Sequence, residues 1–152
     1  MEIKTTYIAF DGKEYDDENL CAEYEYQKKY CTSLSMAHFY DYRGREKPLS
    51  TVITNEANLI FMAYLPSKEA VKTFRKIWAE QGLIGTDGMI EPGFYFYEDD
   101  KCDDKELWHM VDSFPEYIAN QYHSYTIAKR VKEQFNNERR ILHTNNGGRK
   151  RN

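Results

Sequence analysis

The sequence predicts one α+β domain, with a mostly antiparallel sheet of about four to six strands, two or three packed helices and a long C-terminal helix. Three observations predict this class. A hairpin signal opens the chain, apolar runs of strand length lie in its middle, and a capping box precedes a long amphipathic stretch near its end. With 152 residues, 41% of them hydrophobic, the chain is long enough to bury one substantial core.

The first predicted element is an N-terminal β-hairpin. Residues 3–10 are rich in β-branched and aromatic side chains, and Asp11-Gly12 follows, the pair most favoured in a two-residue type I′ turn. The carboxylates of residues 16–18 suit a helix N-terminus, so we expect a short return strand and a helix over residues 17–30. One face of this helix carries Leu20, Tyr24, Gln27 and Cys31.

Two strands are expected after this helix. Residues 34–42 have strand composition, and residues 43–45 form a turn into a second extended run over roughly residues 49–54. Pro48 is consistent with this interpretation, because proline is tolerated at the first residue of a strand.

A strand, a helix and another strand occupy the middle of the chain. Residues 58–65 are a continuous apolar run of strand length, and a helix over residues 68–81 follows the N-cap residue Ser67 and ends at Gly82. Residues 94–97 then form a short aromatic strand. If the two strands are parallel neighbours, the connection between them is right-handed.

A short helix over residues 105–111 leads to the last helix, which has the clearest start signal in the sequence. Ser113-x-x-Glu116 is a capping box, and Pro115 lies in the first turn, where its missing N–H costs nothing. We expect this helix to end near Ile141.

The predicted domain covers residues 1–142. The apolar stripe of the last helix ends at Phe135, so we expect the helix to leave the core there. Residues 143–152 are polar and basic, carry nothing to bury and are predicted to form a disordered tail.

Charge divides the chain into an acidic body and a basic end. Residues 1–116 carry 13 Lys and Arg against 23 Asp and Glu, a net charge of −10, whereas residues 117–152 carry 8 against 2, a net charge of +6. Net charge acts on association and solubility more than on topology, so this division concerns how the protein meets partners.

No catalytic or cofactor motif is present in the sequence, so we expect a non-enzymatic protein without cofactor or metal. The densest carboxylate cluster, residues 98–104, lacks the central glycine of an EF-hand and is expected to be a solvated loop. The histidines are scattered, and the cysteines have no Cys-x-x-Cys spacing. An enzymatic alternative is a small hydrolase that binds a metal through Asp99, Asp100, Asp103 or His109.

The sequence predicts a cytoplasmic protein with no membrane partner. The N-terminus lacks the basic and apolar regions of a secretory signal, and the apolar residues 59–65 are too few to cross a bilayer. The odd number of cysteines, three, favours free thiols in a reducing compartment.

Two surfaces are candidates for partner binding. An acidic, Tyr-rich segment that begins in the aromatic strand and continues beyond it is expected to imitate the phosphates of a nucleic acid and to suit a cationic groove. Its residues are Tyr95, Tyr97, Glu98, Asp99, Asp100, Asp103 and Asp104. The alternative is a phosphate-binding face on the last helix, where most of the basic residues fall within about 100 degrees of one another; a simple solvated helix end is equally consistent. These basic residues are Lys129, Arg130, Lys132, Arg139 and Arg140.

The opening of the chain resembles that of many small accessory proteins encoded by phages and prophages. The resemblance lies in residues 6–16, TYIAFDGKEYD, and in the acidic helix around residues 21–25, and it covers about the first 30 residues. Many proteins of that class lack catalytic residues and act by stoichiometric binding; anti-CRISPR and other anti-defence proteins are examples. The resemblance implies an inhibitor of a host nuclease, such as a CRISPR effector, that binds a host protein or nucleoprotein complex in the host cytoplasm. The alternative is a nucleic-acid-binding accessory protein, and the sequence leaves the oligomeric state open.

Overall fold

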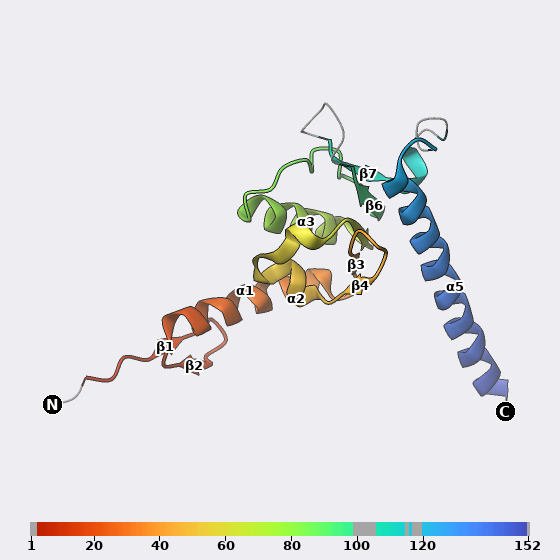
Figure 1. Cartoon of the computed structure of the whole chain (residues 1–152). Coiled ribbons are helices and arrows are strands. Elements are labelled where there is room, and N and C mark those ends of the chain that lie inside the picture. The colour runs from red at the N-terminus through yellow and green to blue at the C-terminus, as the bar shows by residue number, and fades with distance from the viewer. Residues whose placement is uncertain (1–2, 99–105, 115, 117–119, 152) are drawn as a thin grey trace.

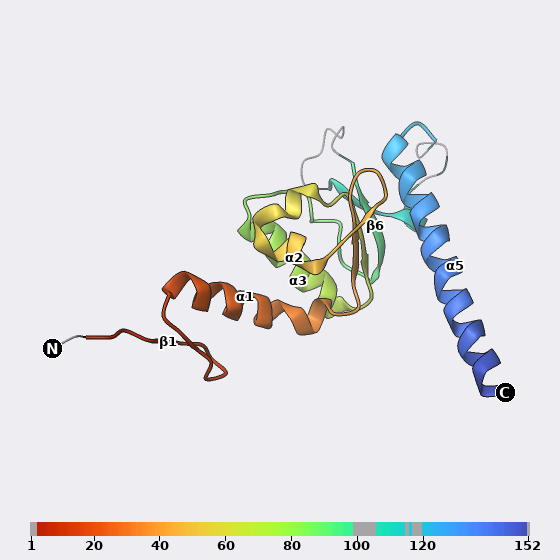
Figure 2. The same ribbon diagram turned by 60° about the horizontal axis from the view of Figure 1, so that its bottom comes forward.

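In the computed structural model, an antiparallel sheet lies between helix α3 (Lys68–Glu80) on one face and helix α5 (His123–Arg151) on the other (Figures 1 and 2). The structure describes residues 3–98, 106–114, 116 and 120–151. The strands of the sheet are β3 (His38–Tyr40), β4 (Glu46–Lys47), β5 (Met62–Leu65), β6 (Gly93–Tyr97) and β7 (Trp108–Met110). They lie in the order β4-β3-β5-β6-β7, and each neighbouring pair is antiparallel. The predicted α+β class is confirmed.

Both faces of the sheet are buried, one beneath α3 and the other beneath α5. Successive side chains of a strand point to opposite faces, so each strand contributes to both clusters. In β6, Tyr95 belongs to the cluster that packs against α3, whereas Phe94 and Phe96 belong to the cluster that packs against α5. The same alternation separates Phe39 from Tyr40 in β3. Covering on both faces explains why the aromatic strand has no polar alternation in the sequence.

The helix predicted over residues 68–81 is confirmed as α3. The Ser67 hydroxyl accepts a hydrogen bond from the backbone N–H of Ala70 (3.1 Å) and caps the N-terminus. Gly82 follows the helix with a φ of +77°, the left-handed conformation that commonly ends a helix. The buried residues of α3 are Ala70, Val71, Phe74, Ile77 and Trp78.

The N-terminal hairpin is also confirmed, with strands β1 (Tyr7–Ile8) and β2 (Glu14–Tyr15), but its turn differs from the prediction. A two-residue type I′ turn needs a positive φ at both central residues. Of Asp11 and Gly12, only Gly12 has one (+91°), and its N–H donates to the carbonyl of Ala9 (2.9 Å). The connection is therefore a three-residue turn.

Helix α1 (Glu18–Leu34) continues beyond its predicted end, and its C-terminal half reaches the core. Leu34 is buried there, and the Ser33 hydroxyl lies 2.8 Å from the Thr73 hydroxyl of α3. Leu20, predicted on the buried face, is 54% exposed. The hairpin and the first half of α1 project away from the sheet (Figures 1 and 2).

The strand predicted over residues 49–54 is wrong, because this stretch is helical. It comprises α2 (Leu49–Thr51) and the irregular turns η1 (Val52–Glu56) and η2 (Ala57–Leu59). The side-chain amide of Gln81 holds it in place: the amide donates to the carbonyl of Val52 (2.6 Å) and accepts from the N–H of Ala57 (3.0 Å). These bonds join segments far apart in the sequence, so local composition does not reveal them.

The strand predicted over residues 94–97 is confirmed as β6, whereas the run over residues 58–65 is strand only in its second half, as β5. The two strands are antiparallel, with Met62 opposite Phe96. The connection through α3 is therefore not a parallel crossover. The loop over residues 82–92 leads the chain from the end of α3 back to the start of β6.

The short helix predicted over residues 105–111 is wrong where the structure describes it, since β7 lies there instead. Trp108 is opposite Tyr97 in β6. Its ring packs edge-on against Phe74 and Trp78, with ring centres 5.3 Å apart in both pairs. Burial of this large ring against α3 outweighs the local helical pattern.

Glu116 of the predicted capping box is helical, and its carbonyl accepts a hydrogen bond from the N–H of Asn120 (3.0 Å). Residues 120–122 are not helical, however, so the long helix α5 begins only at His123. A short helical turn, η3 (Val111–Ser113), precedes it. The Ser113 hydroxyl donates to the carbonyl of Met110 (3.1 Å), within this turn. Pro115, the other predicted start signal, lies outside the described residues.

At its other end, α5 runs through Arg151, beyond the end predicted near Ile141. Phe135 is the last of its described side chains to be buried, as predicted, and the helix extends past the sheet (Figure 1). Disorder of residues 143–152 in solution stays a prediction. Across the described residues, none of the helices is both long and apolar enough to span a membrane.

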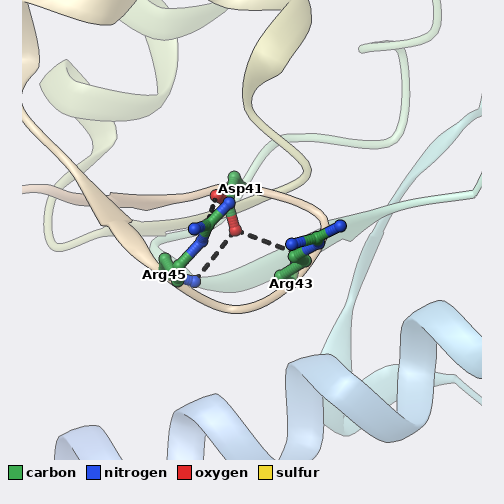
Figure 3. A network of polar contacts seen from close by, with 3 residues as sticks. All are labelled: Asp41, Arg43 and Arg45. Carbon is green, nitrogen blue, oxygen red and sulfur yellow. Dashed lines mark hydrogen bonds and ion pairs between the residues drawn. The ribbon is translucent and has the colours of Figure 1, made fainter.

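The turn between β3 and β4 is closely packed against α5. The buried Asp41 carboxylate accepts hydrogen bonds from the backbone N–H groups of Arg43 and Arg45 (2.9 Å each) and from the Arg45 guanidinium (3.1 Å; Figure 3). Burial raises the pKa of Asp41, but these bonds and the nearby positive charge outweigh burial, so its pKa is lowered. Gly44 has a φ of +82°, and a Cβ there would lie 2.8 Å from Val131 of α5.

Candidate interaction surfaces

The segment predicted to present an acidic, Tyr-rich surface is buried at two of its residues. Tyr95 is 1% exposed, because it points from β6 into the core beneath α3, and its hydroxyl donates to the carbonyl of Glu91. Glu98 is 4% exposed, because α5 begins beside it and Ser124 donates a hydrogen bond to its carboxylate (2.6 Å). The prediction is therefore wrong for these two residues as exposed contacts. Tyr97 is half-buried, and Asp99, Asp100, Asp103 and Asp104 lie outside the described residues.

An acidic surface is instead visible on what we call the N-terminal arm, residues 7–25. The arm comprises the β1–β2 hairpin and the first turns of α1, and it projects from the molecule (Figure 2). It carries seven carboxylates against one cationic side chain, Lys13. The carboxylates are Asp11, Glu14, Asp16, Asp17, Glu18, Glu23 and Glu25.

Apolar side chains are exposed on the same arm. Ile8 is 64% exposed, Phe10 67% and Leu20 54%. Burying such side chains against a partner is favourable, because apolar surface is removed from water. The arm therefore offers apolar contacts surrounded by negative charge, a combination that suits a protein partner.

The arm is held together by contacts around Tyr24. The Tyr24 hydroxyl donates to the Asp11 carboxylate (2.6 Å), and its ring centre lies 5.5 Å from that of Tyr15. The Lys13 ammonium lies 4.6 Å from the centre of the Tyr24 ring. The hydrogen bond lowers the pKa of Asp11 and raises the pKa of Tyr24 to about 12. These contacts join hairpin to helix, so the arm is one preformed unit.

The sequence pattern did not indicate the arm as a candidate surface, although its carboxylates are plain in the sequence. We used residues 16–18 to predict a helix N-terminus, and Asp17 does cap α1, accepting from the N–H groups of Asn19 (2.7 Å) and Leu20 (3.3 Å). The missed signal was the weak apolar face of an acidic helix, which indicates an element outside the core.

Two of the five basic residues proposed on α5 contact the rest of the domain. Lys132 forms an ion pair with Asp112. Arg139 lies 3.4 Å from the Tyr64 hydroxyl and 5.4 Å from the centre of the Phe135 ring. Lys132 thus contacts the turn η3, and Arg139 contacts strand β5. Four of the five are exposed, including Arg139; the other exposed residues are Lys129, Arg130 and Arg140.

The described residues offer no metal centre, since they hold no group of three or more His, Cys, Asp or Glu side chains that could bind an ion. The His109 ring packs 5.7 Å from the Phe96 ring, between the sheet and residues near the start of α5. Cys21 is buried in the arm, and burial together with the Glu25 carboxylate raises its pKa, which disfavours the reactive thiolate.

Comparisons with protein-family models, curated proteins and solved structures found no match to this chain. The candidate surfaces therefore rest on geometry and charge. The two charged elements lie on opposite sides of the molecule, the acidic arm near the N-terminus and the basic helix near the C-terminus (Figure 1).

Proposed function

We propose that the protein is a non-enzymatic binding protein whose N-terminal arm occupies a cationic groove on a protein partner. The observation that supports this most strongly is the arm itself: a projecting element with seven carboxylates, one lysine and three exposed apolar side chains. An element that only stabilised the fold would face the core.

The chemistry of the arm suits a groove that normally binds nucleic acid. Its carboxylates present negative charge across a hairpin and a helix, as phosphates do along a nucleic acid backbone. Complementary charge speeds association, by roughly 10- to 1000-fold at low salt, and salt weakens the effect. The exposed Ile8, Phe10 and Leu20 add apolar contacts that a nucleic acid competitor lacks.

The resemblance of the opening to phage accessory proteins makes a host nuclease the partner to test first. A CRISPR effector carries a positively charged channel for its heteroduplex, which is the kind of groove the arm would fit. In this proposal the protein acts in the host cytoplasm by stoichiometric binding.

Size-exclusion chromatography with purified CRISPR effectors, followed by a nuclease assay, tests the proposal. We expect co-elution with at least one effector, and loss of its activity once the protein is equimolar. Separate migration from every effector, with unchanged nuclease activity, would remove this class of partner.

A matched pair of variants tests the arm. The arm variant is Glu14→Gln, Asp16→Asn and Glu23→Gln, and the control variant is Glu56→Gln, Glu106→Gln and Glu116→Gln. All six side chains are exposed, and both variants change the net charge equally. We expect the arm variant to bind at least about tenfold more weakly and the control to bind within about twofold of the wild type. Equal weakening would show that net charge, not the arm, controls binding.

A second candidate function is nucleic-acid binding through α5, favoured by the exposed Lys129, Arg130 and Arg140. Fluorescence anisotropy with a DNA duplex at several salt concentrations tests it. Neutralising these three residues to Gln should weaken binding and reduce the salt slope by roughly one for each phosphate that the helix no longer neutralises. Unchanged binding in this variant rejects the function.

A further inference from the structure

The outer edge of strand β1, in the N-terminal arm, is an open edge of a sheet. Among the described residues, β1 pairs only with β2. The N–H of Ala9 donates to the carbonyl of Lys13 (2.8 Å), so the backbone of Ala9 faces β2. Bonded and non-bonded residues alternate along an antiparallel strand, so the backbone groups of Tyr7 also face β2, whereas those of Thr6 and Ile8 face away. Thr6 and Ile8 are exposed, which leaves their N–H and C=O groups accessible to a partner.

The sequence of this edge does not protect it from pairing. Charged side chains and proline blunt many edge strands, but residues 5–10, TTYIAF, contain neither. The run is rich in β-branched and aromatic residues, and two of its apolar side chains are largely exposed, Ile8 at 64% and Phe10 at 67%. Such a segment readily accepts another strand.

The edge strands of the central sheet differ from β1 in this respect. β4 consists of two charged residues, Glu46 and Lys47. At β7, the N–H of Trp108 donates to the carbonyl of Gly85, in the loop before β6 (3.0 Å). Of these three edges, β1 is therefore the most open to a further strand.

The charge of the arm indicates what kind of strand fits this edge. The arm carries seven carboxylates against one lysine, and Glu14 of β2 lies opposite Ile8. A strand added to β1 would lie two strand spacings from β2, about 10 Å, which is roughly the Debye length at 0.1 M salt. The arm therefore attracts a basic strand and repels the acidic arm of a second copy.

We propose that the outer edge of β1 binds an extended segment of the protein partner, rich in Lys or Arg, as a third strand. Main-chain hydrogen bonds with Thr6 and Ile8 supply the affinity of this pairing, and the carboxylates of the arm select basic side chains. The source of the segment rests on the proposed function, whereas the pairing itself requires only the arm.

An NMR titration of the full chain with the peptide Ac-Lys-Val-Lys-Val-Lys-Val-NH2 tests the edge without any partner. We expect saturable shifts of the arm amides, and hydrogen exchange of the Thr6 and Ile8 amides at least about tenfold slower at saturation. The Tyr7 and Ala9 amides, which face β2, should already exchange more slowly than these two in the free chain. No saturable shift, or shifts without slower exchange of Thr6 and Ile8, would overturn the proposal.

Two control peptides separate strand pairing from attraction by charge. Ac-Lys-Pro-Lys-Pro-Lys-Pro-NH2 carries the same charge but cannot add a regular strand. Ac-Glu-Val-Glu-Val-Glu-Val-NH2 can add a strand but carries the opposite charge. Each control should bind at least about tenfold more weakly than the lysine–valine peptide. Equal binding of either control overturns the proposal, because pairing and charge are both required.

Thr6→Pro and Thr5→Pro are matched variants at exposed threonines, and only Thr6→Pro removes an N–H that faces the outer edge. Thr6→Pro should weaken binding of the lysine–valine peptide at least about fivefold, the worth of one hydrogen bond, and Thr5→Pro should change it less than about twofold. Slow exchange of the Ala9 amide establishes that the hairpin is intact. If Thr6→Pro loses the hairpin, the control peptides decide.

Equal binding by the two folded variants overturns the proposal. Self-association of the wild-type chain that Thr6→Pro abolishes, measured by sedimentation, also overturns it and assigns the edge to a second copy. Because no partner is present in these experiments, failure here leaves the arm's proposed function untouched.

Discussion

Asp41 and Gly44 shape the turn that approaches α5. The Asp41 carboxylate takes up the backbone N–H groups that the turn leaves unpaired, and Gly44 lets the turn approach Val131 closely. Both residues lie in or beside the turn itself, which is why the sequence predicted the turn. The approach of Gly44 to Val131 joins positions far apart in the sequence, so the sequence did not predict that contact.

Asp41→Asn should lower the free energy of unfolding by about 1–3 kcal/mol at neutral pH, because the variant has no charged acceptor in the turn. The folded pKa of Asp41 lies below its unfolded value. Its contribution is therefore complete above the unfolded value of about 4 and is lost as pH falls through the folded pKa. Denaturant unfolding from pH 7 to acid should show a steeper loss in the wild type than in the variant.

Asp87→Asn is the control for this measurement. The Asp87 carboxylate is exposed and forms a long ion pair with the Arg75 guanidinium (N–O distance 3.9 Å). Such surface pairs contribute little, so Asp87→Asn should change the free energy of unfolding by less than about 0.5 kcal/mol. An equal cost at both positions would contradict the role assigned to Asp41.

Gly44→Ala should destabilise the protein more than Gly12→Ala. Both glycines have positive φ, +82° and +91°, so alanine costs about 1 kcal/mol at either position. At Gly44 the new Cβ would also meet Val131 at 2.8 Å, whereas nothing lies within 4 Å at Gly12. Overpacking should add about 1–3 kcal/mol, measured by denaturant unfolding. An equal loss of unfolding free energy in both variants would show that α5 does not pack closely against this turn.

Among the elements, those with local signals were predicted and those decided by distant contacts were not. α3 was predicted nearly in full, because Ser67, Gly82 and the apolar spacing all lie within it or beside it. The stretch after Pro48 was mistaken for a strand, because the Gln81 amide that holds it lies beyond the next helix. The candidate surface followed the same rule: the sequence shows charge, but burial of Glu98 depends on where α5 begins.

Tyr24 reports whether the arm keeps its structure in solution. Its pKa is raised to about 12 by the hydrogen bond to Asp11. Asp11→Asn removes the negative charge and should return the pKa toward the ordinary value of about 10. Ultraviolet titration of tyrosine, with NMR assignment of Tyr24, measures this. Leu20→Gln, an exposed change on the same arm, should leave it unaltered. An ordinary Tyr24 pKa in the wild type would mean that hairpin and helix are not joined.

At the scale of the whole molecule, a modest net charge of −4 is the sum over two strongly charged elements on opposite sides of the central sheet. The domain between them separates the acidic arm from the basic helix. In the proposed functions, the arm meets a cationic protein groove and α5 meets a phosphate backbone. This separation explains why overall composition did not decide between the two functions.

Site-specific photo-crosslinking in host lysate tests the central claim most directly. A photoreactive residue replaces Asn19 on the arm or Asn137 on α5, both of which are exposed and uncharged. We expect position 19 to crosslink to a nucleic-acid-binding protein, and the product to diminish when a DNA competitor fills that protein's groove. Position 137 should not give this product. Identical products at both positions, or a protein crosslink at position 137 and none at position 19, would contradict the role of the arm.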